Sequence, residues 1–259
     1  MSNAISSRIR KLCYRAYWRL EKMIAPNLRD SQYLYKEILE SYVPTDGRWL
    51  ELGCGHQILP SWIRSSKETE AALVDRTRIT VGVDPVLEQV RKHSTIQHRV
   101  VATIENCPFR NNSFDFISAN MVMEHVQDPG RALSEAYRIM DNRGVLVFHT
   151  PNYWNYQVFL ASLMPQWMKN KLVPILEGRS DQDVFPTAYK INTVPQIERM
   201  AAQYGFRVIE IKMVNSTAIS AMLFPLAVFE LLLIRLLETR FLQRYRTNMI
   251  AVLQKQEGK

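Results

Sequence analysis

The chain has 259 residues, of which 47% are hydrophobic and 22% are charged. These values are typical of a globular protein with a sizeable core and one or two domains, and they exclude a disordered or fibrous chain. The net charge of +8 leaves contacts with nucleic acid or an anionic membrane surface open. Three cysteines without metal-binding spacing favour a reducing cytoplasm, and no signal peptide is apparent.

The first predicted element is a basic amphipathic helix between Arg8 and Lys22. Six residues of this segment are basic and one is acidic, and apolar residues recur at helical spacing as far as Ile24. Such a helix can lie on an anionic membrane surface. It can also pack over a core with its basic face in solvent, or bind nucleic-acid phosphates. We expect residues 1–45 to form an N-terminal helical extension.

From residue 46 onward, predicted strands and helices alternate, which indicates a parallel sheet with helices on both faces. The predicted strands are residues 48–53, 78–84, 98–103, 114–119, 144–150, 206–213 and 247–254. The predicted helices begin near residue 59, at residues 84–85, at residue 129 and at residue 193. We expect residues 46–259 to form one domain.

A glycine turn follows the first predicted strand. Gly53 and Gly55 allow the backbone to approach a ligand that a Cβ atom would obstruct. The second strand ends at Asp84, which is placed to accept hydrogen bonds from a ribose diol at the carboxyl edge of the sheet. The dinucleotide-binding pattern is not met, because residue 58 is isoleucine. The turn therefore predicts a ligand that carries a nucleoside.

Two insertions interrupt the alternation of strands and helices. Residues 151–192 are aromatic and poorly periodic, and they are a candidate substrate collar or an accessory subdomain. Residues 216–244 contain an apolar segment long enough to span a bilayer. Pro225, Glu230 and Arg235 interrupt this segment, and charges are costly at membrane depth. We predict a helix that is buried, dimerising or embedded in one leaflet.

The segment Glu51-Leu-Gly-Cys-Gly-His-Gln57 resembles motif I of the class I S-adenosylmethionine-dependent methyltransferases. Gln57 stands where the family usually has a third glycine. Residues 103–117, 120–129 and 133–151 are similar to the later motifs of that family, in the same order. The resemblance implies a Rossmann-like seven-stranded sheet with an N-terminal helix, an insertion after strand 5 and a helical insertion between strands 6 and 7. It also implies that the last strand returns antiparallel into the same sheet, which argues against a membrane span before it.

The resemblance further implies S-adenosylmethionine as the cofactor, and methyl transfer from it requires no metal. The implied cofactor-binding residues are Glu51, Gly53, Gly55, Asp84, Pro85, Thr103, Ile104, Glu105 and Asn120. The first three and Asn120 would hold the methionine portion. Asp84 would hold the ribose hydroxyls, and the remaining residues would surround the adenine. Many relatives have aspartate at the position of Thr103.

Two histidines at strand ends are candidate general bases, because an imidazole titrates near neutrality. His125, next to Glu124, follows the fourth strand, and His149 ends the fifth. Either histidine can instead brace the structure. Tyr153, Trp154 and Tyr156 are candidates to line an acceptor pocket.

A looser similarity of residues 150–156 and 183–187 to bacterial methyltransferases of cell-surface polysaccharide and glycolipid synthesis implies O-methylation of a sugar, a glycolipid or another small or lipid-linked acceptor. We expect a cytoplasmic enzyme, peripheral at the inner membrane surface, and a dimer remains open. Two alternatives also remain open. An RNA or protein methyltransferase would suit the positive charge, although Thr150-Pro-Asn-Tyr153 lacks the second proline common among amino-group methylators. A non-catalytic interaction protein would suit the departures at Gln57 and Thr103.

Overall fold

The computed structural model describes residues 14–163, 186–221 and 224–257. The chain forms two compact units. The sheet unit contains Gln32–Tyr153, Pro186–Lys212 and Met249–Lys259, and the accessory unit contains Met1–Ser31, Trp154–Phe185 and Met213–Asn248. Helix α2 (Ser31–Tyr42) therefore lies almost wholly in the sheet unit, whereas both insertions contribute to the accessory unit.

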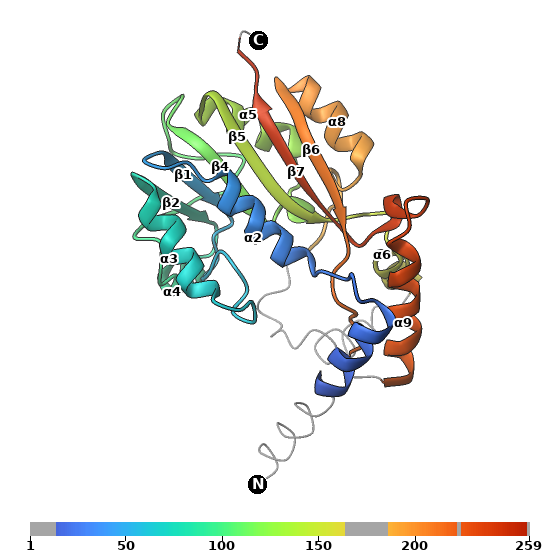
Figure 1. Ribbon diagram of the computed structural model, residues 1–259. Helices are drawn as coiled ribbons and strands as arrows, with labels where there is room; N and C mark the ends of the chain where they lie inside the picture. The colour runs from blue at the N-terminus through green and yellow to red at the C-terminus, as the bar shows by residue number, and fades with distance from the viewer. Residues whose placement is uncertain (1–13, 164–185, 222–223, 258–259) are drawn as a thin grey trace. The chain divides into compact units, whose positions relative to one another are not determined.

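A seven-stranded sheet in the order β3-β2-β1-β4-β5-β7-β6 is the centre of the fold (Figure 1). Its strands are β1 (Arg48–Leu52), β2 (Ile79–Asp84), β3 (His98–Val101), β4 (Phe114–Asn120), β5 (Met140–Pro151), β6 (Phe206–Val214) and β7 (Asn248–Lys255). The pairs among the first five strands are all parallel. The predicted Rossmann-like sheet is confirmed.

Strand β7 runs antiparallel to both of its neighbours. Just after its end, the Gln256 backbone N–H donates to the carbonyl oxygen of Gly205, directly before β6, at 2.9 Å. The amine of Lys255 donates to the carbonyl oxygen of Met140, the first residue of β5, at 2.6 Å. The end of β7 therefore lies beside the beginnings of β5 and β6, as the predicted antiparallel return requires.

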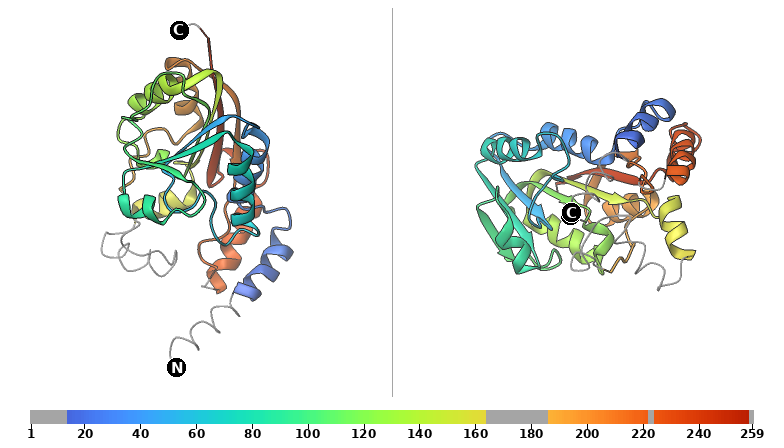
Figure 2. Two further views of the ribbon diagram at one scale, coloured as in Figure 1. Left: turned by 90° about the vertical axis from the view of Figure 1, so that its left-hand side faces the viewer. Right: turned by 90° about the horizontal axis from the view of Figure 1, so that it is seen from below.

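Helices cover both faces of the sheet, with α2 and α3 (Ser66–Arg76) on one face and α5 (Pro129–Ile139) and α8 (Val194–Gln203) on the other (Figures 1 and 2). Consequently the central strands are apolar on both sides: Trp49, Leu50, Phe116 and Phe148 are almost fully buried. Two short helices, α4 (Leu87–Lys92) and the 3-10 helix η1 (Met123–His125), follow β2 and β4.

The helix starts predicted at residues 129 and 193 are confirmed, and each has a side-chain cap. The carboxylate of Asp128 accepts a hydrogen bond from the Arg131 backbone N–H, and Pro129 occupies the first turn. The Thr193 hydroxyl accepts from the backbone N–H of Gln196 in the same way.

Two other predicted helix starts are wrong. The helix expected near Leu59 begins only at Ser66, because residues 53–65 form turns and Ser65 has a left-handed φ of 57°. Glu70 of α3 reaches back to accept the Leu59 backbone N–H at 2.8 Å, which holds this longer turn in place. The helix expected to open at Asp84 begins at Leu87, since Asp84 is still the last residue of β2.

Strand β5 begins four residues before its predicted start. Met140 pairs with Phe114 and Val145 pairs with Phe116, so the residues between Met140 and Val145 bulge out of the ladder. Arg143 in this bulge has a φ of 61°. The turn at Asn142-Arg-Gly144 is therefore an irregularity inside the strand.

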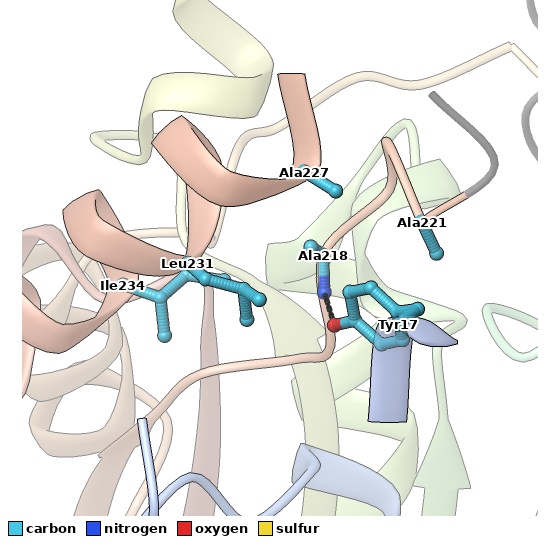
Figure 3. Packing of buried hydrophobic residues seen from close by; sticks show 6 residues of the cluster. All are labelled: Tyr17, Ala218, Ala221, Ala227, Leu231 and Ile234. Carbon is cyan, nitrogen blue, oxygen red and sulfur yellow. Dashed lines mark hydrogen bonds between the residues drawn. The ribbon is translucent and has the colours of Figure 1, made fainter. Parts of the chain in front are cut away.

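Within the described residues, the helices of the accessory unit are the one at residues 14–24, α6 (Tyr156–Leu163), α9 (Phe224–Leu237) and the 3-10 helix η3 (Gln243–Tyr245). Its core is a cluster of buried side chains (Figure 3): Tyr17, Ala218, Ala221, Ala227, Leu231 and Ile234. The Tyr17 hydroxyl accepts a hydrogen bond from the Ala218 backbone N–H at 2.9 Å. The predicted helical insertion before the last strand is thus confirmed, and among the described residues no helix is long and apolar enough to cross a membrane.

Glu230, one of the charges that interrupt the apolar segment, lies buried in this unit. Its carboxylate accepts hydrogen bonds from the backbone N–H groups of Ile219 and Ser220, at 3.1 and 2.9 Å, and from the Tyr156 hydroxyl at 2.6 Å. These donors compensate for the lost hydration of a buried carboxylate. The hydroxyl of Tyr156, a candidate to line an acceptor pocket, thus donates to Glu230 within the accessory unit.

Candidate functional site

The carboxyl ends of β1 and β2 meet at Asp84, which is 9% exposed. One carboxylate oxygen accepts the Gly55 backbone N–H at 3.0 Å, and the other accepts the Val86 backbone N–H at 2.8 Å. Each carboxylate oxygen can accept two hydrogen bonds, so Asp84 retains capacity for the hydroxyl groups of a ligand. Asp84 thus shapes the glycine turn and keeps acceptor capacity at the carboxyl edge of the sheet.

Gly53 and Gly55 both have left-handed backbone conformations, with φ of 64° and 51°, but their surroundings differ. A Cβ atom at Gly53 would lie 2.3 Å from Cγ2 of Val122. A Cβ atom at Gly55 would have no heavy atom within 4 Å. Gly53 therefore allows the turn to pack against the segment after β4, whereas Gly55 borders open space where a ligand can approach the backbone.

Glu51 is buried in β1 and linked to β4. The indole N–H of Trp49 donates to the Ser118 hydroxyl at 2.5 Å, and that hydroxyl donates to the Glu51 carboxylate. Burial raises the pKa of Glu51 from its ordinary 4.5 to about 8, and the hydrogen bond from Ser118 offsets part of that rise. Glu51 therefore supports the strand directly before the glycine turn.

The raised pKa of Glu51 predicts a pH-dependent stability. A carboxyl group with a higher pKa in the folded state contributes most to stability below its unfolded pKa, about 4.5, and this contribution is lost as the pH rises to about 8. We expect Glu51→Gln to remove this dependence. Its free energy of unfolding, relative to that of wild type, is then expected to rise by about 2–4 kcal/mol between pH 5 and pH 8. Urea unfolding at both pH values measures the difference. Glu68→Gln, on the exposed side of α3, is the control, and parallel profiles for wild type and Glu51→Gln would contradict the expectation.

The side-chain amide of Asn120, at the end of β4, is saturated with hydrogen bonds. Its oxygen accepts from Gln32 Nε2 at 3.2 Å and from His149 Nδ1 at 2.9 Å. Its nitrogen donates to Gln32 Oε1 and to the carbonyl oxygen of Ile58, both at 3.0 Å. Because an asparagine amide accepts two hydrogen bonds and donates two, only the backbone of Asn120 is left for a ligand. The side chain instead ties α2, the turn after β1 and the end of β5 together.

Gln32 was not singled out from the sequence. It lies on α2, 88 residues from its partner Asn120, and one glutamine on an amphipathic helix carries no signal of such a pairing. Its paired amide bonds make it part of the support of the site.

His149 is fully buried at the end of β5. Its ring stacks on Tyr35 with the centroids 5.6 Å apart, and burial lowers its pKa from 6.5 to about 3. The imidazole is therefore neutral near pH 7, and its Nδ1–H can donate only towards the Asn120 oxygen. His149 is therefore better placed to orient the Asn120 side chain than to take a proton from an acceptor.

His125 lies at the end of η1, with its side chain 31% exposed. Nδ1 is 3.1 Å from the carbonyl oxygen of Pro186. Since a carbonyl only accepts hydrogen bonds, Nδ1 carries the hydrogen, and Nε2 is the nitrogen that can take up a proton. Nε2 lies 3.9 Å from Oε1 of the buried Glu124, whose other oxygen accepts the Thr150 hydroxyl at 3.1 Å. Glu124 is thus placed to stabilise a protonated His125.

An aromatic pair lies beside His125. The backbone oxygen of Glu124 accepts from the N–H groups of Ala188 and Tyr189, at 2.6 and 3.2 Å, which holds the segment after residue 186 against η1. The ring of Tyr189 lies 5.7 Å from that of Tyr153, and Tyr153 is half exposed. The two rings are tilted by 55° to each other, and the backbone of Tyr189 is tied to the residue next to His125.

The predicted adenine-side residues lie in the loops after β2 and β3, whose ends pair through Asp84 and Val101. Pro85 and Thr103 are exposed, Ile104 is buried, and Glu105 is half-buried with its carbonyl oxygen bonded to Arg131 Nε at 3.1 Å. The neighbouring Leu87 is 45% exposed. It was not singled out from the sequence, and it adds apolar surface to the loop after β2.

A family model described as a methyltransferase domain matches residues 28–211, which include every residue of this site. The chain belongs to the class I S-adenosylmethionine-dependent methyltransferases. Its cofactor is S-adenosylmethionine. The site fits this molecule, because Asp84 can accept from ribose hydroxyls and the backbone at Gly55 borders open space.

The similar proteins include methyltransferases that are named for different acceptors. A ubiquinone biosynthesis O-methyltransferase of Vibrio atlanticus is 27% identical over 175 residues, which are 65% of this methyltransferase and 70% of the relative. A malonyl-[acyl-carrier protein] O-methyltransferase of Legionella pneumophila is 35% identical over 109 residues, 40% of this chain and 36% of the relative. A chain from the complex of a Haloferax volcanii methyltransferase activator has the same fold, with a TM-score of 0.58, 17% identity, and coverage of 87% of this chain and 89% of that chain.

Proposed function

We propose that this methyltransferase methylates a hydroxyl oxygen of a sugar, a glycolipid or another small or lipid-linked acceptor. The observation that carries the proposal is the placement of His125. Its side chain is partly exposed at the carboxyl edge of the sheet. Its Nδ1 donates to the carbonyl oxygen of Pro186, and its Nε2 lies 3.9 Å from Oε1 of Glu124. The O-methyltransferases of Vibrio atlanticus and Legionella pneumophila support oxygen as the methylated atom.

O-methylation requires that a hydroxyl group lose its proton while its oxygen attacks the methyl carbon. S-adenosylmethionine supplies a methyl group on a sulfonium, which is a good leaving group. During this transfer His125 Nε2 would take the hydroxyl proton, and the Glu124 carboxylate would stabilise the resulting imidazolium. Tyr153 and Tyr189 provide a surface on which a sugar ring or another flat acceptor can stack.

His125→Ala is expected to lower kcat by about 10²- to 10⁴-fold, which is the usual contribution of a general base. Binding of S-adenosylhomocysteine is expected to stay within threefold of wild type, because the imidazole does not support Asp84 or the glycine turn. The rate of methyl transfer from labelled S-adenosylmethionine to the cell fraction that accepts label measures kcat. Calorimetric titration measures the binding of S-adenosylhomocysteine. His98→Ala, on the exposed edge of β3, is the control. A kcat within a few-fold of wild type would remove His125 as the base.

The acceptor class is tested by incubating the enzyme with methyl-labelled S-adenosylmethionine and fractionated cell lipids, polysaccharides, proteins and RNA. Label in the lipid or polysaccharide fraction that resists treatment with mild base supports an O-methyl ether. Label in RNA or protein would support the alternative that the positive net charge leaves open. Transfer to no fraction, from a protein that binds the cofactor, would favour a non-catalytic interaction protein.

We also propose that the enzyme acts in the cytoplasm, peripherally at the inner membrane surface. Support comes from the helix at residues 14–24, whose exposed side carries Arg15, Arg19 and Lys22 together with Trp18. Basic residues interleaved with tryptophan are typical of helices that lie on anionic lipid. A lipid-linked acceptor would then be presented at the same surface.

A further inference from the structure

Helix α9 is apolar on two opposite sides. One side packs into the accessory-unit core through Ala227, Leu231 and Ile234, as Figure 3 shows. The other side, which we call the α9 outer face, consists of Leu226, Phe229, Leu232 and Leu236, all of which are between 50% and 71% exposed. These residues follow each other at intervals of three or four, so they form one stripe along the helix. A helix that is apolar on two opposite sides needs a second apolar environment on its outer side.

Exposed apolar side chains are concentrated in the accessory unit. Helix α6 has no buried residue, and Phe159, Leu160 and Leu163 on it are 61%, 49% and 66% exposed. Just beyond α9, Phe241 is 94% exposed. Single exposed apolar residues are ordinary on a protein surface, but clustered ones mark an interaction site.

The charges of the accessory unit are arranged asymmetrically. Among its described residues, each of the four acidic side chains is buried or half-buried: Glu21, Asp30, Glu230 and Glu238. The basic side chains are exposed instead, apart from the half-buried Arg246, and Arg240 and Arg244 follow the carboxyl-terminal end of α9. The exposed charges of the described part of the accessory unit are therefore positive.

We propose that the α9 outer face docks on a bilayer of anionic lipids, with its leucine and phenylalanine side chains among the upper acyl chains and the arginines on lipid phosphates. This inference rests on the proposed membrane localisation but not on the identity of the acceptor. The 14 residues of α9 extend about 21 Å, which suits a helix lying in the plane of the interface. A second copy of the chain is a poorer occupant, because it would bring the same positive charge to the interface.

The test is sedimentation of the full-length protein with vesicles that contain phosphatidylglycerol, compared with vesicles of phosphatidylcholine alone. We expect wild type to bind the anionic vesicles, less strongly at high salt. We expect Phe229→Gln and Leu236→Gln each to weaken binding about tenfold, because each removes one inserted apolar side chain. Arg240→Glu is expected to weaken binding to anionic vesicles. Ile209→Gln, a 40% exposed position on β6 in the sheet unit, is the matched control.

Several outcomes would overturn the proposal. Wild type that does not bind phosphatidylglycerol vesicles, or Phe229→Gln that binds as wild type does, contradicts it. A dimer in light scattering that Phe229→Gln converts to a monomer, without vesicle binding, would assign the face to a second copy. A lower melting temperature of Phe229→Gln without vesicle binding would assign it to contacts within the chain. Calorimetry with S-adenosylhomocysteine on the same variants is expected to be unchanged, so a failure of docking is distinguishable from a failure of the methyltransferase site.

Discussion

Asp84→Ala is expected to weaken S-adenosylhomocysteine binding at least about 100-fold, and methyl transfer with it. The substitution removes the acceptor for the ribose hydroxyls and also the two hydrogen bonds that the carboxylate accepts from the backbones of Gly55 and Val86. A hydrogen bond to a charged group contributes about 1.5–3 kcal/mol, and every 1.4 kcal/mol corresponds to a factor of ten in affinity. Calorimetric titration of the purified proteins measures the change.

Two further variants separate the causes of that loss. Asp84→Asn keeps one amide oxygen as an acceptor and is expected to bind between wild type and Asp84→Ala. Asp75→Ala, an exposed aspartate on α3, is expected to bind as wild type does. If Asp84→Ala were folded and bound the cofactor product within threefold of wild type, the placement of the ribose at Asp84 would be wrong.

The two glycines of the turn are expected to respond differently to alanine. At Gly53 the new Cβ atom would lie 2.3 Å from Val122 in a backbone with a φ of 64°. Left-handed strain of about 1–2 kcal/mol and overpacking of about 1–3 kcal/mol then lower the free energy of unfolding by about 2–5 kcal/mol. At Gly55 only the strain applies, because the Cβ atom meets open space. We therefore expect Gly55→Ala to lose about 1–2 kcal/mol of stability and to bind S-adenosylhomocysteine about 10- to 100-fold more weakly.

Thermal unfolding and calorimetry on both alanine variants check this pair of expectations. Gly130, whose φ is not in the left-handed region, is not a suitable control, since its Cβ atom would meet the Tyr204 hydroxyl at 2.3 Å. Ala72→Ser on the exposed side of α3 serves instead. Equal melting temperatures for the two glycine variants would contradict the role of Val122. Unaltered affinity of Gly55→Ala would show that the ligand does not approach this backbone.

Much of the sheet was predictable because each strand that carries the site ends at a conspicuous residue. Gly53 follows β1, Asp84 ends β2, and Asn120 ends β4. The helix after β1 was predicted too early, because the apolar residues around Leu59 are buried as part of an extended turn and not of a helix. That turn is held by Glu70 and Asn120, contacts between residues far apart in sequence that no local pattern reveals.

The chemistry of individual site residues was less predictable than their positions. Asn120 stands at the expected strand end, yet its side chain is saturated by Gln32, Ile58 and His149. His125 and His149 look alike in sequence, but one is partly exposed and the other is fully buried with a lowered pKa. Burial and hydrogen-bond saturation depend on the whole packed unit, and a single sequence does not report them.

The position of β7 constrains the order in which the sheet can form during synthesis. Strand β7 follows β6 in the chain but lies between β5 and β6, and six of its first seven residues are buried. When β6 leaves the ribosome it has no neighbour in the sheet, and β5 has an open edge. The two can join only after residues 248–255 are available, and the apolar helix α9 precedes these residues in the chain. A chain of this topology leaves the edge of β5 and the strand β6 unpaired until β7 is in place, and during that interval it is most exposed to aggregation.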